Sequence, residues 1–532
     1  MALHGKNIIG QRLSAEGSRT FRAIDPSTGE PIDPPFHEAT AAEVDRAAEA
    51  AAAAFDAADH FDSARRVALL DAIATGIEAL GEELVARAAA ETGLDAERLR
   101  AERARTCFQL RLFARLVAEG SWVDARIDRA APDRKPVAKP DLRRMLVALG
   151  PVVVFPASNF PLAFSVAGGD TASALAAGCP VVVKARPQHA GTSELVGEVV
   201  RRAVGEAGLP DGWFSMLHGA GREIGVQLVR HGAIQAVGLT GSLQAGRTLA
   251  DVAAGRPDPI PVFAEMGSVN PVFLLPGALA QAAEAIAEGF HRSLTMGVGQ
   301  FCTNPGVVVA VEGESLDRFL RRLAELVEAT PPATMLDQAI WDGYHHGVQE
   351  LAQLDGVELL SRGKQPADRG RTQCVPAVFL TDQAAFLKHG RLRQEVFGPA
   401  SVVVRVASVE AMREVARAFG GQLTATIHAT RAELAAERPL LAILACKAGR
   451  IVVNHFPTGL EVCPATHHGG PYPATTDARF TSVGTAAIYR FVRPVCFQDF
   501  PEEQLPAELR DLNQRGIWRL IDGTLTRDDV RR

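Results

Sequence analysis

Cysteine is scarce in this sequence, and its pattern argues against two kinds of small stabilised domain. The seven cysteines are widely spaced and include no Cys-x-x-Cys pair. Neither a disulfide framework nor a zinc site is therefore expected, and no metal ligand is predicted. Cys107, Cys179 and Cys446 stand in apolar or alanine-rich surroundings, which favours thiols that pack as small hydrophobic side chains.

An excess of positive charge is also lacking. The chain has 56 lysines and arginines against 62 aspartates and glutamates, a formal net charge of −6, and no dense basic stripe interleaved with aromatic residues. Nucleic acid is therefore not expected as a partner. No run approaches the roughly 18 apolar residues of a membrane span, and the first residues are too polar for a signal peptide. We expect a soluble cytoplasmic protein without a membrane partner.

The length of 532 residues exceeds what one hydrophobic core usually supports, so two or three domains are expected. Alanine-rich stretches with acidic starts predict helices over 40–57, about 63–93 and about 95–119. The segment 132–140, rich in proline, lysine and arginine, interrupts this helical block and is typical of an exposed arm or linker.

Short apolar, β-branched runs alternate with helical stretches after residue 145. This alternation is typical of βαβ units and of parallel sheets covered on both faces, and it predicts two consecutive α/β domains. The expected strands lie at 152–155, 180–183, 213–217, 236–239, 271–275, 306–310, 400–404, 424–427 and 449–454.

Two glycine turns follow successive expected strands. The run 219–225 has three residues between its last two glycines, where the dinucleotide fingerprint has two, so a simple turn opening a helix is the alternative. The run 238–246 also opens a helix, whose first amides are suited to a phosphate. Together the two turns indicate nucleotide binding more strongly than either does alone.

A thiol and a carboxylate stand near glycines that let backbone approach a ligand closely. Cys302 lies in 299–306, and Glu265 lies 37 residues earlier in 263–271. This pair is consistent with a nucleophile and its base, although a buried core thiol remains the alternative for Cys302.

Six motifs in order resemble the aldehyde dehydrogenase superfamily over nearly the whole chain. They are Pro156-Ala157-Ser158-Asn159-Phe160-Pro161, Val183-Lys184, Gly238-Leu239-Thr240-Gly241-Ser242, Glu265-Met266-Gly267-Ser268, Gly299-Gln300-Phe301-Cys302 and Glu395-Val396-Phe397-Gly398-Pro399. The resemblance implies an α/β fold with a Rossmann-like cofactor domain, an α/β catalytic domain and a small β oligomerisation flap. The cofactor domain would comprise 1–131 and 150–265, and the catalytic domain 266–474. The flap would comprise 132–149 and 475–505, and a C-terminal tail would follow at 506–532.

Three later runs are similar to the branch of the superfamily that oxidises 2-oxoglutarate semialdehyde (2,5-dioxopentanoate). They lie at 454–459, 469–475 and 491–496, and the run 302–306 fits the same branch. They depart from the commoner ending, which has a glycine loop containing lysine and serine. Aliphatic or fatty aldehydes are the alternative substrates.

The resemblance implies a two-step reaction. The Cys302 thiolate forms a thiohemiacetal, hydride leaves for the nicotinamide, and a thioester remains. The Asn159 amide and the Cys302 backbone N–H would stabilise the oxyanion, and Glu265 would activate the hydrolytic water. Acyl transfer to coenzyme A would need no such base, so a hydrolytic enzyme is favoured over an acylating one. A catalytically silent binding relative is the third alternative.

The cofactor residues are also implied by the resemblance. Relatives that prefer NAD often carry a glutamate three residues after the lysine, where this chain has Pro187. With Arg186, His189 and Arg222 close by in the expected fold, NADP is the predicted cofactor and NAD the alternative. The expected cofactor-binding residues are Lys184, Arg186, Arg222, Thr240, Gly241, Ser242, Gly246, Glu395 and Phe397.

The substrate residues and the assembly are less constrained by sequence. Arg292 and Ser293 are candidates for binding the acid tail of a 2-oxo acid, with a solvated helix position as the alternative for Arg292. Phe160, Phe164 and Phe456 are expected either to line an apolar tunnel or to pack in the core. The flap implies a homodimer or a homotetramer.

Overall fold

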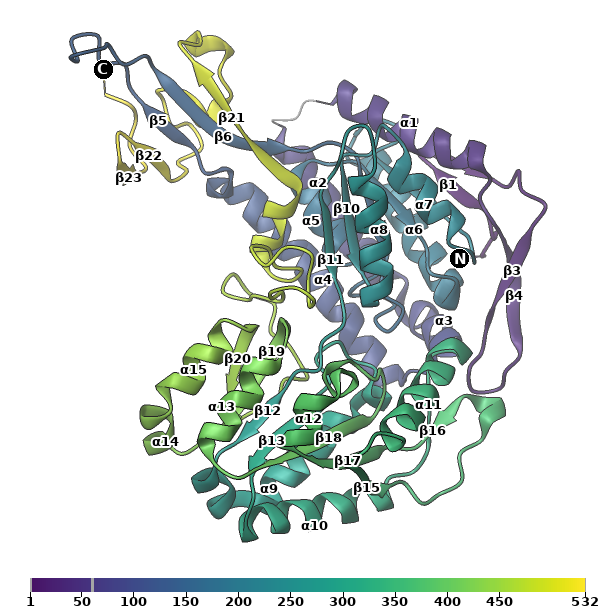
Figure 1. Cartoon of the computed structure of the whole chain (residues 1–532). Helices are drawn as coiled ribbons and strands as arrows, with labels where there is room; N and C mark the ends of the chain where they lie inside the picture. Colours follow the sequence, from purple (N-terminus) through teal and green to yellow (C-terminus); the bar gives the residue numbers. More distant parts are fainter. Residues whose placement is uncertain (1, 59–61, 532) are drawn as a thin grey trace.

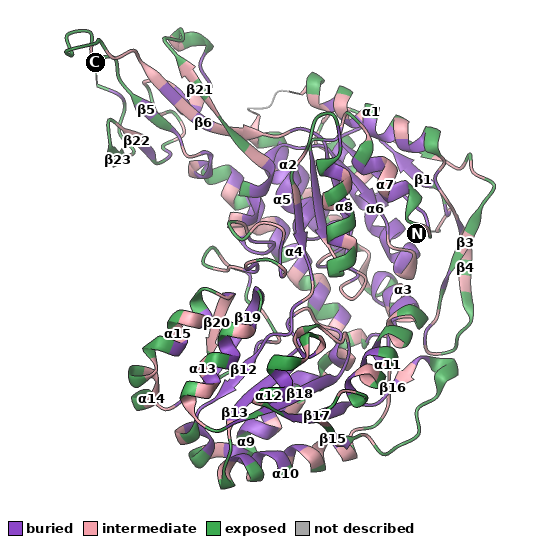
Figure 2. Ribbon diagram, viewed as in Figure 1, coloured by how far each residue is buried: buried purple, intermediate pink, exposed green. Residues whose placement is uncertain are grey.

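The structure is a computed structural model that describes residues 2–58 and 62–531. Two α/β lobes lie one above the other, and a long β arm projects from the upper lobe (Figure 1). Both sheets are covered by helices on their two faces, and their central strands are buried (Figure 2). The prediction of two consecutive α/β domains is confirmed.

The first domain contains a seven-stranded sheet in which five neighbouring strands are parallel and the two strands at one edge are antiparallel. Alternate residues point to opposite faces, so Val152 and Val154 join one core cluster while Val153 and Phe155 join another. In spatial order the strands are β11 (Val262–Glu265), β10 (Ala236–Thr240), β7 (Val152–Phe155), β8 (Val181–Lys184), β9 (Phe214–Leu217), β1 (Asn7–Ile9) and β2 (Arg12–Ser14).

Each face of this sheet is covered by its own helices. One face packs against α1 (Ala41–Ala57), α7 (Glu223–Arg230) and α8 (Leu243–Ala254). The other packs against α2 (Ser63–Ala79), α4 (Ala96–Glu119), α5 (Gly169–Ala177) and α6 (Ala190–Glu206). The single helix expected over about 63–93 is divided, because Gly81 at φ +56° separates α2 from α3 (Gly81–Thr92).

The second domain repeats this arrangement around another seven-stranded sheet. In spatial order its strands are β15 (Val357–Arg362), β17 (Ala377–Asp382), β18 (Ala400–Val406), β13 (Val307–Val311), β12 (Val272–Leu274), β19 (Gln422–His428) and β20 (Ala448–Val453). One face packs against α9 (Pro276–Thr295) and α10 (Glu314–Ala329). The other packs against α11 (Gln338–Ala352), α12 (Gln383–Lys388), α13 (Val409–Ala418), α14 (Arg431–Ala436) and α15 (Arg438–Ala445).

The projecting arm is a five-stranded sheet built from distant parts of the chain. Its order is β21 (Val492–Gln498), β6 (Leu142–Ala148), β5 (Arg126–Asp128), β22 (Arg519–Ile521) and β23 (Thr524–Thr526). The expected flap segments do pair, but the assigned boundaries need correction. The range 506–532 is not a separate tail, since β22 and β23 complete this sheet, and β5 comes from the range assigned to the cofactor domain.

Two further expectations are tested by burial and helix length. Cys107 and Cys179 are buried as predicted, whereas Cys446 is exposed at the end of α15, so its assignment to the core was wrong. Within residues 2–58 and 62–531, no helix combines the length and apolar character that crossing a membrane requires.

Candidate active site

The edge where parallel strands end brings the predicted carboxylate and thiol together. Glu265 is the last residue of β11 and lies beside Thr240, the last residue of β10. Cys302 stands in the loop between α9 and β13, directly after the short helix η3 (Met296–Gly299). Residues from the two domains therefore meet where the carboxyl ends of strands usually form a site.

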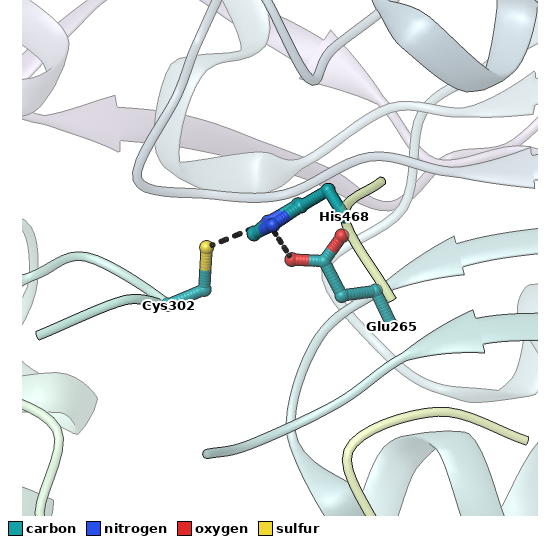
Figure 3. A group of neighbouring side chains, drawn as sticks. All are labelled: Glu265, Cys302 and His468. Atoms are coloured by element: carbon teal, nitrogen blue, oxygen red, sulfur yellow. Dashed lines mark hydrogen bonds and ion pairs between the residues drawn. The ribbon is translucent and has the colours of Figure 1, made fainter. Parts of the chain in front are cut away.

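A histidine completes this group (Figure 3). The Nε2 atom of His468 lies 3.4 Å from the Sγ of Cys302 and 2.9 Å from the Oε1 of Glu265. The second oxygen of Glu265 accepts a hydrogen bond from the Ser482 hydroxyl. Glu265 and His468 are 3% and 2% exposed, so water screens their interaction little. One side-chain nitrogen, sulfur or carboxylate oxygen atom from each of the three residues lies within 4.8 Å of those of the other two.

The environment shifts the ionisation of both reacting groups. Burial by itself would raise the pKa of Glu265, but the contact with His468 and the hydrogen bond from the Ser482 hydroxyl leave it below its ordinary value. Burial and then the Glu265 carboxylate raise the pKa of the Cys302 thiol well above its ordinary value. The site therefore keeps the carboxylate ionised and opposes formation of the thiolate.

A buried polar network fixes the loop that carries Cys302. Asn270 donates from Nδ2 to the carbonyl oxygens of Cys302 and Asn304, at 2.8 and 2.9 Å. Its own backbone N–H donates to Gln422 Oε1 at 3.1 Å, which also accepts from Ser268 Oγ at 2.9 Å. Asn270 adopts φ +47°, a conformation that asparagine tolerates better than most residues. This network extends from β19 to the backbone of Cys302.

One face of α4 positions the loop of Asn159. The side chains of Arg98 and Glu102 are one turn apart, and Arg98 donates to the Asn159 carbonyl at 2.8 Å. Glu102 accepts from the backbone N–H groups of Leu162 and Ala163, at 2.8 and 2.9 Å. The Asn159 amide donates to the Gln300 carbonyl at 2.9 Å, which leaves its second N–H for a ligand.

A cavity of about 350 Å³ lies over the carboxyl ends of the strands in the first domain. It is lined by Lys184, Arg186, Arg222 and Ser242, while Thr240 and Gly241 form the backbone beside it. None of the described lining residues is a carboxylate. The concave shape and the three cations fit an anionic dinucleotide.

Three expected cofactor groups are placed differently from the rest. Arg186 donates to the carbonyls of Pro156 and Thr240, so part of its guanidinium is occupied by backbone. His189 is buried against Ser193 and does not line the cavity. Gly246 also lies away from the cavity lining. A Cβ at this position would come within 2.4 Å of the Met266 sulfur. Its glycine is explained by close packing of α8 on β11.

Glu395 and Phe397 line a separate recess together with Phe301 and Gly299. A Cβ on Gly267 would meet Glu395 at 2.6 Å, so this glycine lets the carboxylate lie against the backbone after β11. Burial raises the pKa of Glu395 to about 8. The recess adjoins the Cys302 loop, while the larger cavity lies beside Lys184.

Aromatic rings form a cluster beside the thiol loop. Phe160 lies 5.3 Å from Phe164 and 5.1 Å from Phe301 between ring centroids. Phe456 instead packs against Phe290 in the core of the second domain, so its core alternative holds. Ser293 is buried and hydrogen-bonded to Thr458.

The expected acid anchor Arg292 is exposed on α9, whereas another arginine lies nearer the thiol. Arg105, on the α4 face that holds Glu102, has its guanidinium 5.4 Å from the Phe164 ring, and its charge acts on Cys302 and Glu265. Its Nε is buried and has no hydrogen-bond partner among the described residues.

Two residues of interest, His468 and Arg105, were missed from the sequence. His468 directly precedes the Gly469-Gly470 pair of the run 469–475, which resembles the 2-oxoglutarate semialdehyde branch, so a signal was present in the sequence. Arg105 lies in a helix with many arginines, and no local pattern separates it from Arg103 or Arg111.

Comparison with known proteins agrees with this geometry. The model of the aldehyde dehydrogenase family matches residues 13–471. Alpha-ketoglutaric semialdehyde dehydrogenase 2 of Azospirillum brasilense is 53% identical over 524 residues, which cover 98% of this chain and 99% of that protein. The alpha-ketoglutaric semialdehyde dehydrogenase of Acinetobacter baylyi is 44% identical over 527 residues, which cover 99% of each chain.

Solved structures support the fold. Betaine aldehyde dehydrogenase from Staphylococcus aureus in complex with NAD+ superposes with a TM-score of 0.80 at 20% identity, covering 94% of this chain and 96% of that one. The 3,6-anhydro-L-galactose dehydrogenase in complex with NADP superposes with a TM-score of 0.78 at 22% identity, covering 93% of this chain and 99% of that one. With a family model that spans most of the sequence and relatives aligned almost end to end, the chain belongs to the aldehyde dehydrogenase family and is an aldehyde dehydrogenase.

Proposed function

We propose that the protein oxidises 2-oxoglutarate semialdehyde (2,5-dioxopentanoate) to 2-oxoglutarate. The observation that carries this proposal is the end-to-end similarity to two relatives named for that substrate, at 53% and 44% identity. A second observation supports it: the half-buried Arg105 lies beside the aromatic cluster, with an unpartnered Nε and a charge that acts on Cys302. A carboxylate on the substrate would supply that partner.

The described residues supply each step of the chemistry. Cys302 attacks the aldehyde carbon, and the free N–H of Asn159 with the Cys302 backbone N–H stabilises the oxyanion. A nicotinamide dinucleotide, when bound, supplies the hydride acceptor. Glu265 then removes a proton from the water that hydrolyses the Cys302 thioester, because its lowered pKa keeps it ionised.

The residues that would hold the cofactor line two separate cavities. Lys184, Arg222 and Ser242 line the larger cavity and would bind the adenosine half, while Glu395 and Phe397 would bind the nicotinamide half. Arg222 is exposed at the cavity and no described lining residue is acidic, which suits a 2′-phosphate. NADP is therefore the proposed preferred cofactor. A higher kcat/KM for NAD than for NADP would overturn this preference.

The decisive assay combines purified protein with 2,5-dioxopentanoate and NADP or NAD, and follows the absorbance of the reduced cofactor with and without coenzyme A. We expect turnover that does not need coenzyme A. An absolute requirement for coenzyme A would indicate an acylating enzyme, and no turnover of any aldehyde would indicate a silent relative.

A second substrate class is favoured by one observation. The rings of Phe160, Phe164 and Phe301 form an apolar cluster close to the thiol loop, which suits an aliphatic aldehyde. Under this alternative, kcat/KM for pentanal or longer aldehydes would exceed the value for 2,5-dioxopentanoate.

A further inference from the structure

His468 places a single ring nitrogen against both reacting groups of the site (Figure 3). Its Nε2 lies 3.4 Å from Cys302 Sγ with hydrogen-bonding geometry. The same atom lies 2.9 Å from Glu265 Oε1, but that oxygen has no aligned hydrogen bond among the described residues. The same ring nitrogen is thus within reach of both the sulfur and the carboxylate.

The backbone holds this arrangement rigidly. The His468 N–H donates to Thr481 Oγ1 at 2.8 Å, and its carbonyl accepts from the Ser482 N–H at 2.8 Å. Ser482 also holds the far oxygen of Glu265, so one short segment positions both partners. The ring is buried and its Nδ1 has no hydrogen-bond partner among the described residues. No other described contact of the ring explains its position beside the thiol.

The thiol needs a proton acceptor that does not disable the water-activating base. If Glu265 took the thiol proton, it would become neutral before the thioester forms. A bare thiolate beside the Glu265 carboxylate would also place two negative charges in a buried site, at a large electrostatic cost. A cation between the two groups removes both difficulties.

We propose that His468 is a catalytic residue that takes the proton of the Cys302 thiol. The S–H bond breaks, its electron pair stays on sulfur, and the proton binds to Nε2. The resulting imidazolium lies between the thiolate and the Glu265 carboxylate, which is its counter-ion at 2.9 Å. Glu265 stays ionised and later takes the proton of the hydrolytic water. The two proton transfers thus have separate acceptors.

This assignment rests on the proposed thioester mechanism, but its first test needs no aldehyde. The rate at which iodoacetamide alkylates Cys302 at pH 7 reports the population of thiolate. We compare the parent with His468→Gln, which keeps the size and an N–H donor but is not a base, and with His468→Ala. Cys302→Ala identifies the background, and His467→Ala removes the half-buried neighbouring imidazole of the same loop as a control.

The rate of Cys302 alkylation is expected to fall at least tenfold in both His468 variants. In His467→Ala this rate should equal that of the parent. Added imidazole should restore part of the rate in His468→Ala alone. In a first turnover with 2,5-dioxopentanoate, hydride transfer in His468→Gln is expected to fall by about 10² to 10⁴, the usual contribution of a positioned acid–base group.

A folded His468→Gln that binds NADP normally and is alkylated at the parent rate would overturn the proposal. If His468 only positioned Glu265, alkylation and first-turnover hydride transfer would be unchanged and only acid release would slow. If 2,5-dioxopentanoate is not the substrate, the alkylation comparison still decides the role of His468, so the two proposals fail separately.

Discussion

At the scale of single residues, burial shifts the ionisation of two groups that would meet the cofactor, Lys184 and Glu395. Burial, with a further contribution from the neighbouring Arg186, lowers the pKa of Lys184 to about 8. Its Nζ donates to the Gly219 carbonyl at 2.6 Å and lines the cavity. Lys184 is therefore charged at neutral pH and loses its proton in mildly alkaline solution, which no property of the isolated residue would suggest.

Cofactor affinity should consequently depend on pH. Because the ammonium form is the one that attracts a phosphate-bearing ligand, NADP binding is expected to be constant below pH 7 and to weaken above pH 8, by up to about tenfold per pH unit. Fluorescence titration between pH 6 and 9.5 measures this dependence. Lys184→Met should bind more weakly with a flat profile over this range, and a flat profile in the parent would exclude Lys184 as the titrating group.

Replacement of Glu265 separates the two chemical steps. In Glu265→Gln the base for water is lost while the nucleophile remains, so one equivalent of reduced cofactor should form and further turnover should fall by about 10² to 10⁴. Rapid mixing followed by steady-state measurement detects the burst. Turnover at the parent rate would show that another group activates the water.

Arg105 offers a test of substrate choice. In Arg105→Met, loss of a charged hydrogen bond to the carboxylate of the substrate should lower kcat/KM for 2,5-dioxopentanoate by about 10- to 100-fold. The kcat/KM for pentanal, which has no carboxylate, should fall much less. Arg292→Ala, at the exposed position that the sequence favoured, is the matched control and should change neither value. Equal losses for both aldehydes in Arg105→Met would mean that Arg105 has only a structural role.

At the scale of elements, α4 connects the core of the first domain to the site. Leu99, Leu110 and Phe113 pack inside, while Arg98, Glu102 and Arg105 lie on the face toward the Asn159 loop. Burial raises the pKa of Glu102, although Arg98 and the two backbone N–H groups oppose this effect. The periodicity of the sequence predicts the helix, but not which polar face is buried.

Removal of the Glu102 carboxylate should therefore loosen the oxyanion loop. Glu102→Ala leaves two buried N–H groups unsatisfied, so we expect a loss of about 2 to 5 kcal/mol in stability together with a lower kcat. Denaturant unfolding and steady-state kinetics measure the two effects. Glu97→Ala, on an exposed turn of the same helix, should cost no more than about 1 kcal/mol. Similar behaviour of the two variants would contradict the assigned role.

Most buried strands were predicted from the sequence, while the short and exposed ones were not. The parallel strands β7 and β13 are continuous runs of apolar residues, and β8 and β18 each contain a run of three valines, since both faces of the sheets are covered. By contrast, β2 and β22 have three residues each and are formed by pairing with distant segments. Such pairing leaves little trace in local composition.

At the scale of the whole molecule, the projecting arm offers a surface for self-association. Its segments expose several large apolar side chains, namely Val137, Phe500, Leu512, Trp518 and Leu525. A monomer rarely exposes so many on one projection, and β21 and β23 form the free edges of its sheet. We propose that this arm joins subunits in a homodimer or homotetramer.

Light scattering at micromolar concentration should give a mass of two or four chains. Leu525→Glu, on the exposed strand β23, is expected to shift the mass toward the monomer, because a charge would be buried at the interface. Leu359→Glu, at an exposed position on β15 far from the arm in sequence, provides a control that should not change the mass. A parent protein that is monomeric at this concentration would refute the proposal.

The sequence by itself determined the two α/β domains, the thiol, its carboxylate and the glycine turns, because these depend on local composition and short spacing. Tertiary structure decided that His468, 166 residues after Cys302, contacts the thiol, and that Arg105 rather than Arg292 lies near it. It also decided the charges of Glu265, Lys184 and Glu395. The physical reason is that burial and ionisation depend on neighbours that only the folded chain brings together.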